Sequence, residues 1–394
     1  MKYILVVPDG VADKPIAELG NQTPLQKAKT PTLDAIVQKG LLGQIQTVPR
    51  TLPSGSDVAC MSLLGYDPRR YYTGRAPLEA ASLGIPMKEG EVAFRCNLVT
   101  VQDGKMQDYS AGHISSQEAK TLIESMEKKC GGPFHFYPGV QYRHIMVTHG
   151  HKEVKCTPPH DIAGKEVKSY EPTGDGAEDL KVLMATSMNT FKEEPVNKQR
   201  EREGKLPATQ IWLWGQGTRP TLPSFKEQYG LEGAVISAVD LVRGVGRIVG
   251  LEVIQVPGAT GYFDTDYAAK ARYGLEALKR KDFLFVHVES TDEAGHMGDV
   301  ALKVKAIEDF DEKLLSTLLE GLSKIREFRL LLLPDHTTST AIRTHTHDPV
   351  PFVLHGSGVT SNGFSRFTEP EAARSDLFVP EGYTLMGKFL KGEF

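Results

Sequence analysis

The pattern of apolar positions predicts a sheet that is buried on both faces. Several short runs are made mainly of apolar, often β-branched residues and show no regular alternation with polar ones. The clearest are Tyr3 to Val7, Asp282 to Val288, Arg329 to Leu333 and Val350 to Leu354. Such runs are typical of parallel strands covered by helices on both sides. Apolar residues in Val300 to Leu319 recur every three to five positions instead, which predicts an amphipathic helix. Strands that alternate with helices indicate an α/β fold.

The middle of the chain has a different pattern. From about residue 90 to about residue 222 it holds polar loops rich in Gly, Pro and His, with one helical stretch at Ser116 to Lys129 and strand-like pieces at Arg143 to Thr148 and Gln210 to Trp214. We therefore predict a discontinuous core domain, residues 1–89 and 223–394, interrupted by an inserted α+β domain, residues 90–222.

The composition of the chain argues against several classes of protein, namely nucleic-acid-binding, membrane-spanning and disulfide-rich proteins. The 394 residues include 46 basic and 50 acidic ones, which gives no electrostatic footprint for nucleic acid or an anionic membrane. No apolar stretch is long enough for a transmembrane helix, and the first apolar run is too short for a signal peptide, so we predict a cytoplasmic protein. The four cysteines are scattered without a CxxC pair, which argues against a thiolate zinc site and a disulfide framework.

Polar residues directly follow three of the predicted strands. Asp9 follows the first run, Asp292 comes shortly after the second, and Asp335 with His336 follows the third. In open α/β sheets, ligands bind beyond the carboxyl ends of the strands. A fourth polar segment, Arg343 to Asp348, precedes the last strand and would fold back over the same edge. These residues are therefore predicted to converge.

The types and spacing of these residues favour divalent metal ions. A single Asp means little, because Asp is common in turns, but several at one sheet edge change the interpretation. Asp292 and His296 are four residues apart and share a face if the segment is helical, so they could bind one cation. The side chains of Asp335 and His336 diverge and could serve two ions. Carboxylates and imidazoles without thiolate suit Mn²⁺, Zn²⁺ or Mg²⁺.

A serine-containing loop supplies candidates for a nucleophile. Ser54 and Ser56 lie in a Pro-Ser-Gly-Ser sequence that leads into the apolar stretch Val58 to Leu64. This places a serine near a predicted helix N-terminus, where backbone N–H groups favour an anion. Taken alone, the serine could be a simple helix cap. Beside two metal ions, its hydroxyl could instead attack a phosphoryl group. The spacing does not decide between the two serines.

Motifs along nearly the whole chain carry a family resemblance. They are Asp9-Gly10, Gly55-Ser56-Asp57, Leu64-Gly65-Tyr66-Asp67-Pro68, Tyr72-Thr73-Gly74-Arg75, Gly258-Ala259-Thr260-Gly261, Asp292-Glu293-Ala294-Gly295-His296, Pro334-Asp335-His336 and His345-Thr346-His347-Asp348-Pro349-Val350-Pro351. In these motifs the chain resembles the archaeal-type cofactor-independent phosphoglycerate mutases of the alkaline phosphatase superfamily. That group includes bacterial relatives proposed as homoserine kinases.

The resemblance implies a fold, a metal centre and a reaction. The implied fold is an alkaline-phosphatase-like core, with a mainly parallel sheet between helices, and an inserted cap domain. Of two divalent ions, Mn²⁺ or Mg²⁺ with Zn²⁺ or Co²⁺ as alternatives, one would be held by Asp9, Ser56, Asp335 and His336, and the other by Asp292, His296 and His345. This prefers Ser56 over Ser54 and His345 over His347. Ser56 would carry a phosphoserine while a small phosphorylated substrate, 3-phosphoglycerate, becomes 2-phosphoglycerate.

The predicted cap contains the candidate substrate-binding residues. They are Asp108, His113, Arg143 and His144, with Arg95, Arg200 and Arg219 as further cationic candidates. Where the archaeal mutases typically have Asp-Arg-Ser-Ala-Gly-Arg, this chain has Asp108-Tyr109-Ser110-Ala111-Gly112-His113, so two arginines of a presumed clamp are missing. This departure motivates one alternative to a mutase, a phosphotransferase acting on homoserine. A third hypothesis is a binding module that keeps the fold without catalysis, but the intact set of metal ligands speaks against it.

Overall fold

The computed structural model describes residues 1–394, which divide into two compact units. The core unit comprises Met1–Tyr72 and Thr221–Phe394, and the inserted unit comprises Thr73–Pro220. The first boundary lies before the predicted one at residue 90. Residues 73–89 belong to the inserted unit because helix α5, Arg75–Ser82, packs Ala76 and Ala80 against Ala93 and Ile145 of that unit's sheet.

The core unit is built on an eight-stranded sheet in the order β15-β2-β14-β11-β1-β10-β8-β9. From one edge to the other the strands are β15 Phe378–Val379, β2 Leu41–Ile45, β14 Val350–Gly356, β11 Phe328–Leu332, β1 Lys2–Pro8, β10 Phe283–Val288, β8 Gly233–Ile236 and β9 Glu252–Val253. All neighbours pair in parallel except those of β14, which is antiparallel to both β11 and β2. The predicted mainly parallel α/β fold is confirmed.

Four of these strands are the predicted apolar runs. They are β1, β10, β11 and β14, each within one or two residues of its predicted bounds. Strand β1 lies between β10 and β11, with Leu5 opposite both Phe285 and Leu331. Because these three strands are parallel, their carboxyl ends meet at one edge of the sheet.

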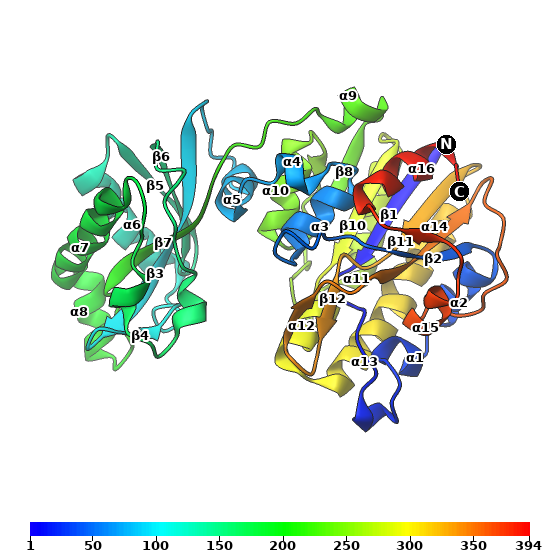
Figure 1. Ribbon diagram of the computed structural model, residues 1–394, viewed down its shortest axis with the longest axis horizontal. Helices are drawn as coiled ribbons and strands as arrows, with labels where there is room; N and C mark the ends of the chain where they lie inside the picture. Colours follow the sequence, from blue (N-terminus) through cyan, green and yellow to red (C-terminus); the bar gives the residue numbers. More distant parts are fainter. The chain divides into compact units, whose positions relative to one another are not determined.

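Helices cover both faces of the core sheet (Figure 1). Alternate residues of the central strands, such as Ile4, Val6 and Leu284, belong to a buried cluster that also contains apolar side chains of α2, α11, α13 and α14. The helices of this unit are α1 Pro24–Lys27, α2 Pro31–Gln38, α3 Ser56–Leu63, α4 Pro68–Tyr71, α9 Phe225–Tyr229, α10 Asp240–Ile248, α11 Tyr267–Leu278, α12 Ser290–Met297, α13 Val300–Asp309, α14 Ser316–Leu322, α15 Glu369–Ala373 and α16 Leu385–Lys391.

The predicted helix Val300 to Leu319 is continuous but not uniformly α-helical. A π-helical stretch, Phe310–Leu315, joins α13 to α14. Asp311 of this stretch is buried, and its two carboxylate oxygens accept hydrogen bonds from the backbone N–H groups of Leu33, at 2.7 Å, and Thr32, at 3.1 Å. Because these N–H groups lie in the first turn of α2 and have no partner within that helix, Asp311 ties the two helices together.

The inserted unit is an antiparallel α+β structure. Its five strands are β3 Glu91–Gln102, β4 Lys105–Asp108, β5 Phe134–Val140, β6 Arg143–His149 and β7 Gln210–Thr218, with β3 pairing β4, β6 and β7. Phe94, Cys96 and Leu98 of β3 belong to one core cluster, and Ala93 belongs to the cluster beneath α5. The first cluster is filled by helices α6 Ser116–Cys130, α7 Ala177–Glu193 and α8 Pro195–Arg202. The helix and strands predicted in this region are confirmed.

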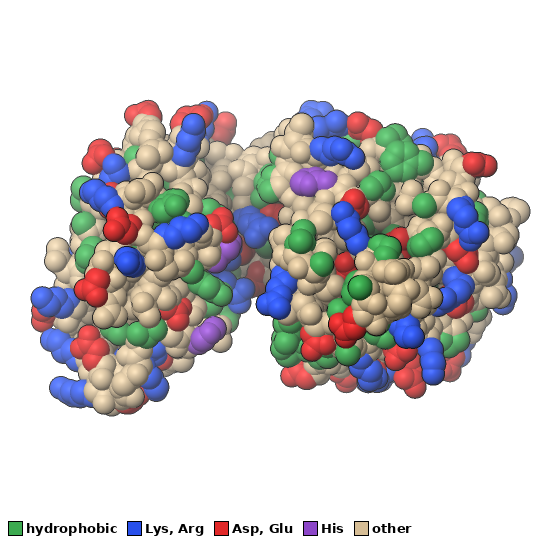
Figure 2. Space-filling model, turned by 60° about the horizontal axis from the view of Figure 1, so that its bottom comes forward, with side chains coloured by type: hydrophobic (Ala, Val, Ile, Leu, Met, Phe, Trp, Pro, Cys, Tyr) green, Lys and Arg blue, Asp and Glu red, His purple; other side chains and the backbone are tan.

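Charge is mixed on the visible face of each unit. Figure 2 shows basic and acidic side chains interspersed on the face that it presents. None of the helices has both the length and the apolar character that crossing a bilayer requires.

Candidate metal and phosphoryl-transfer site

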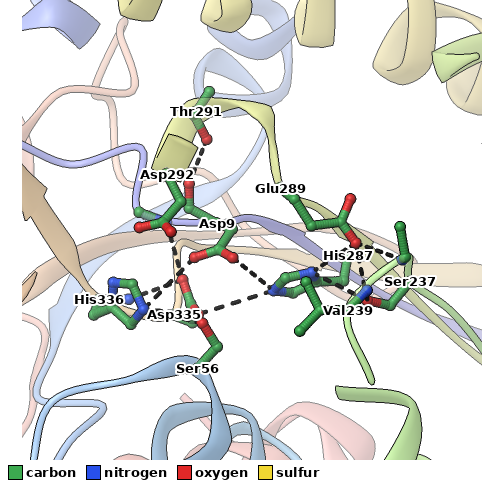
Figure 3. Close-up of polar contacts among 12 residues, drawn as sticks. Asp9, Ser56, Ser237, Val239, His287, Glu289, Thr291, Asp292, Asp335 and His336 are labelled. Atoms are coloured by element: carbon green, nitrogen blue, oxygen red, sulfur yellow. Dashed lines mark hydrogen bonds and ion pairs between the residues drawn. The ribbon is translucent and has the colours of Figure 1, made fainter. Parts of the chain in front are cut away.

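Seven candidate side chains from five separate segments of the core unit lie at the carboxyl edge of its sheet. Asp9 follows β1, Asp335 and His336 follow β11, Asp292 and His296 lie on α12 after β10, and Ser56 is the first residue of α3. His345 lies on β13, Thr344–Thr346, which pairs with β12, Thr337–Ser339, in a two-stranded ribbon. The predicted convergence is therefore present in the structure, and Figure 3 shows five of these side chains, Asp9, Ser56, Asp292, Asp335 and His336.

The first group of side chains surrounds the imidazole Nε2 of His336. This nitrogen lies 3.1 Å from Ser56 Oγ, 3.3 Å from Asp335 Oδ2 and 3.6 Å from Asp9 Oδ1. Asp9, Asp335 and His336 are all at most 3% exposed. Asp9 Oδ1 and Asp335 Oδ2 are buried without any hydrogen-bond partner. Two buried carboxylate oxygens that lack donors and face an imidazole and a hydroxyl form a suitable donor set for a divalent cation.

Thr338 determines how the His336 ring is used. Its hydroxyl donates to Asp292 Oδ1, and its oxygen lies 3.2 Å from His336 Nδ1. Because the single hydroxyl proton is directed to Asp292, Nδ1 is the donor to Thr338, and Nε2 turns its lone pair toward Ser56 and the two carboxylates. Burial lowers the pKa of His336 to about 4, which keeps the ring neutral, as a metal ligand must be.

The second group consists of Asp292, His296 and His345. The two Nε2 atoms lie 3.3 Å and 3.4 Å from the Asp292 carboxylate oxygens and 2.9 Å from each other. Nδ1 of His296 donates to the carbonyl of Arg343, and Nδ1 of His345 to that of Ser54, both at 3.0 Å. Since a carbonyl can only accept, both Nε2 atoms are left with lone pairs that face each other. Such a contact requires a cation or a proton between them.

The electrostatics of the two groups also indicate missing positive charge. Burial, together with the negative charges of Asp292 and Asp335, raises the pKa of Asp9 well above its ordinary value. The hydrogen bond to Asp292 raises the pKa of His296 to about 9. Ligand atoms of Asp9, Asp292 and His336 lie within 4.8 Å of one another, so the two groups adjoin. The residues present fit a pair of neighbouring divalent ions.

Gly10 allows the loop after β1 to approach the ribbon closely. Its φ is +56°, in the left-handed region, and a Cβ built there would lie 2.2 Å from Thr338 Oγ1 and 2.5 Å from Asp292 Oδ1. Its backbone N–H donates to Asp335 Oδ1 at 3.0 Å. A side chain at this position would therefore collide with the residues that orient both groups.

The two choices that spacing left open differ clearly in the structure. Ser54 Oγ donates to the carbonyl of Thr346 at 2.9 Å, whereas Ser56 Oγ faces His336. His347 Nε2 donates to the carbonyl of Leu52 at 2.8 Å, whereas His345 faces Asp292. The N-cap residue of α3 is Gly55, which has no side chain to cap the helix, and this favours an anion bound at Ser56 in the first turn.

The sequence interpretation missed a buried network beside the first group. His287 of β10 is 0% exposed, and its two ring nitrogens face Asp9 on one side and Glu289 on the other, each at 3.4 Å (Figure 3). Glu289 forms a buried ion pair with Lys270 of α11. Burial alone would lower the pKa of His287, but Asp335 and Glu289 raise it to about 9. The available signal was a histidine inside an otherwise apolar strand.

The candidates of the inserted unit do not form a comparable cluster. Asp108 Oδ1 accepts hydrogen bonds from the N–H and the hydroxyl of Ser110, both at 2.6 Å, so its carboxylate closes a turn. His144 is 1% exposed, its Nδ1 accepts from the N–H of Gly139 at 2.9 Å, and burial lowers its pKa to about 3. His113 and Arg143 are exposed.

The additional arginine candidates also differ in their surroundings. Arg95 is paired with Glu79 at 3.0 Å and stacks on Trp214 with 4.2 Å between its Cζ atom and the ring centroid. Arg200 is buried and donates to Glu118 and to the carbonyls of Leu206 and Ala111. These two arginines stabilise the inserted unit from within. Arg219 is exposed.

Comparisons with known proteins agree with the motifs. A sequence model described as 2,3-bisphosphoglycerate-independent phosphoglycerate mutase matches residues 37–197. A relative with this name from Methanothrix thermoacetophila is 50% identical over 393 residues, and one from Methanosarcina barkeri is 48% identical over 398 residues, each covering 100% of both chains. The chain belongs to this family. The resemblance stated from the motifs is confirmed.

Two solved structures share the whole fold of this chain. The cofactor-independent phosphoglycerate mutase from Thermoplasma acidophilum is 28% identical, with a TM-score of 0.68 and 100% coverage of both chains. A protein from Pyrococcus horikoshii is 30% identical, with a TM-score of 0.86, and the match covers 99% of this chain and 96% of the other. The likeness therefore includes the core unit and the inserted unit.

Proposed function

We propose that this protein is a two-metal phosphoglycerate mutase that interconverts 3-phosphoglycerate and 2-phosphoglycerate through a phosphoserine at Ser56. The observation that carries the proposal is the convergence of three carboxylates and three imidazoles at one sheet edge, with buried Asp9, Asp335 and His336 beside the Ser56 hydroxyl. Family membership supplies the substrate class and a place in glycolysis, and hence a cytoplasmic location.

The proposed ligand sets follow the two groups. Asp9, Ser56, Asp335 and His336 would hold one ion, and Asp292, His296 and His345 the other, with Mn²⁺ or Mg²⁺ as the first candidates and Zn²⁺ or Co²⁺ as alternatives. When bound, such ions lower the pKa of a coordinated hydroxyl and neutralise phosphoryl oxygens during in-line displacement. Thr338 and the carbonyls of Arg343 and Ser54 orient the imidazoles, so that every Nε2 atom is free to act as a ligand.

The proposed chemistry has two balanced steps. Ser56 Oγ attacks phosphorus, the bond from phosphorus to the 3-oxygen of glycerate breaks, and the serine proton leaves while the 3-oxygen gains one. The glycerate then turns, its 2-hydroxyl attacks the phosphoserine, and Ser56 is regenerated as its proton returns. The N-terminus of α3, whose N-cap is Gly55, favours the added negative charge at Ser56.

The inserted unit is proposed to recognise the glycerate and to exclude water, since water would hydrolyse an exposed phosphoserine. His113 and Arg143 are the candidates for this role, because both are exposed. His144 is removed from the set of substrate contacts because its ring is buried. Asp108 is proposed to shape the loop that presents His113.

An assay with a coupled product and a labelled intermediate tests the proposal. The purified full chain, supplied with Mn²⁺ or Mg²⁺, should form 2-phosphoglycerate in an enolase-coupled assay without 2,3-bisphosphoglycerate. A rapid quench with phosphoryl-labelled substrate should place the label on Ser56. Absence of product with every divalent metal would overturn the mutase proposal, and O-phosphohomoserine formation from homoserine and a phosphoryl donor would identify the alternative reaction.

A further inference from the structure

His287 lies in the core sheet directly beside the proposed ligands but belongs to neither ligand set. Its position in β10 is opposite Val7 of β1, two residues before Asp9. Its Nε2 atom is 3.4 Å from Asp9 Oδ2 and 3.9 Å from Asp335 Oδ2. The side chain is completely buried, so these carboxylates rather than solvent determine what the ring can do.

The other side of the His287 ring is held by a rigid group of buried polar residues. Nδ1 lies 3.4 Å from Glu289 Oε1 and 3.4 Å from Ser237 Oγ. Glu289 Oε1 in turn accepts from Ser237 Oγ at 2.9 Å and from the backbone N–H of Ala238 at 2.6 Å, and Oε2 pairs with Lys270. Lys270 and Glu289 are almost fully buried, and both carboxylate oxygens of Glu289 have partners. The network therefore runs from Lys270 through Glu289 and His287 to Asp9.

The two carboxylates of the first group are oriented by different means. Asp335 Oδ1 accepts from the backbone N–H groups of Gly10 and His336, each at 3.0 Å, which leaves Oδ2 for an ion. Asp9 is not held in this way by backbone donors: its Oδ2 faces His287, and its Oδ1 faces His336 Nε2 without a hydrogen-bond partner. His287 Nε2 makes no hydrogen bond of its own, so its ion-pair contact with Asp9 Oδ2 at 3.4 Å takes the place that two backbone hydrogen bonds have at Asp335.

We propose that His287, fixed by Glu289 and Lys270, is a positioning residue that holds Asp9 Oδ2 and thereby directs Asp9 Oδ1 to the first ion. This inference rests on the proposed two-metal function. The proposal assigns the Lys270–Glu289–His287 network to the first ion only. The second group is held together by contacts among Asp292, His296 and His345, and no member of the network takes part in them. Residues that orient metal ligands in this way commonly change metal affinity by about 10–100-fold.

Titration of the full-length protein with Mn²⁺ tests this assignment by the affinity of each site. Wild type should bind two ions. His287→Ala and His287→Gln should weaken one ion by about 10–100-fold and leave the other unchanged. In an Asp292→Asn background, which removes a ligand of the second ion, the His287 effect should persist on the ion that remains. His347→Ala is the matched control, because His347 bonds the Leu52 carbonyl outside both groups, and it should change neither affinity.

Glu289→Gln provides a second variant that keeps the size of the side chain. It should weaken the same ion, and combined with His287→Ala it should add little, because both changes break one network. Circular dichroism without metal would establish that each variant is folded. If His287→Ala does not fold, the Mn²⁺ affinities of Glu289→Gln alone decide the question.

Four results would overturn the inference, and the last would overturn the proposed function too. Unchanged affinities in His287→Ala and Glu289→Gln would show that Asp9 needs no such support. Equal weakening of both ions would assign His287 a general structural role. A third ion in wild type that is lost in His287→Ala would make His287 a ligand itself, with Cys60 and Asp335 as its neighbours. A wild-type protein that binds no Mn²⁺ would overturn the two-metal function as well, so the two failures are distinguishable.

Discussion

The two units treat their buried charges differently. In the inserted unit, buried Arg95 pairs with Glu79, and buried Arg200 pairs with Glu118 and with backbone carbonyls, so each charge has a partner within the protein. At the edge of the core sheet, Asp9 and Asp335 keep buried oxygens with no donor. Buried charges are retained only when they are compensated. The buried arginines of the inserted unit are therefore compensated by protein groups. The buried carboxylates at the core edge are not, and bound cations would compensate them.

The same contrast appears in the histidines. His144 in the inserted unit is neutral because burial lowers its pKa to about 3, and its Nδ1 accepts from a backbone N–H. His296 in the core unit has its pKa raised to about 9 by Asp292, and its Nε2 faces that of His345. Identical side chains thus serve packing in one unit and a charge-dependent site in the other.

Replacement of the nucleophile should give the largest effect. Ser56→Ala removes the only hydroxyl that faces His336 Nε2 and should lower kcat by about four orders of magnitude or more. Ser54→Ala is the control, because Ser54 Oγ bonds only a backbone carbonyl and should leave activity within about tenfold. Enolase-coupled kinetics measure both variants, and a fully active Ser56→Ala protein would contradict the phosphoserine route.

Removal of a carboxylate from the second group comes next. Asp292→Asn takes away the charge shared by His296 and His345 and should weaken one of two bound ions by about 100-fold or more. Metal analysis after dialysis measures the loss. Asp282→Asn, at a partly exposed ion pair with Lys2 just before the start of β10, at the other end of that strand from both groups, should retain both ions. Loss of metal from both variants alike would argue against a specific site.

A smaller effect on stability should appear in the inserted unit as the pH falls. The pKa of folded His144 is about 3, against an ordinary value of 6.5, so below pH 6.5 the unfolded chain binds a proton that the folded chain does not. Folding stability therefore falls as the pH drops from about 6.5 toward 3. Between pH 7 and pH 5, wild type should lose about 2 kcal/mol more than His144→Gln.

Denaturant unfolding followed by tryptophan fluorescence measures this difference. Both tryptophans of the chain, Trp212 and Trp214, lie in β7, so the signal reports the inserted unit. Equal loss of stability in wild type and His144→Gln would show that the ring is not held neutral, and would weaken the contrast with the core histidines.

The smallest effect is expected for an exposed cation of the inserted unit. Arg143→Ala should raise KM for 3-phosphoglycerate by about tenfold with little change in kcat, because it removes one charge-assisted contact to an anionic substrate. Lys198→Ala is the matched control, because Lys198 of α8 forms an exposed ion pair with Glu193 at the end of α7. If KM is unchanged in Arg143→Ala, recognition of the substrate depends on other residues.

The sequence predicted the core edge well because its geometry follows from local rules. Carboxyl ends of parallel strands meet, so Asp9, Asp292 and Asp335 could be brought together from strand positions alone. The i, i+4 spacing of Asp292 and His296 predicted that they share a helix face. In α12 they do, with 3.3 Å between His296 Nε2 and Asp292 Oδ2. The choice of Ser56 over Ser54 needed the resemblance, because both serines lie in one short loop.

The parts that were missed depend on packing between distant segments. Lys270 reaches Glu289 only because α11 lies across β10, and no pattern near residue 270 indicates a buried ion pair. Similarly, the apolar face of α5 fits either sheet in principle, and only its contacts with Ala93 and Ile145 assign residues 73–89 to the inserted unit. Arg200 and His144 were candidates for substrate contact because burial cannot be read from one residue's identity.

The most direct test of the account is a crystal structure of the full chain grown with Mn²⁺, with anomalous scattering used to locate the ions. The account predicts two peaks at the core edge, one within roughly 2.0–2.3 Å of Asp9, Ser56, Asp335 and His336 ligand atoms, and one at that distance from Asp292, His296 and His345. Anomalous peaks found only elsewhere, or a fully soaked crystal with none at this edge, would contradict it.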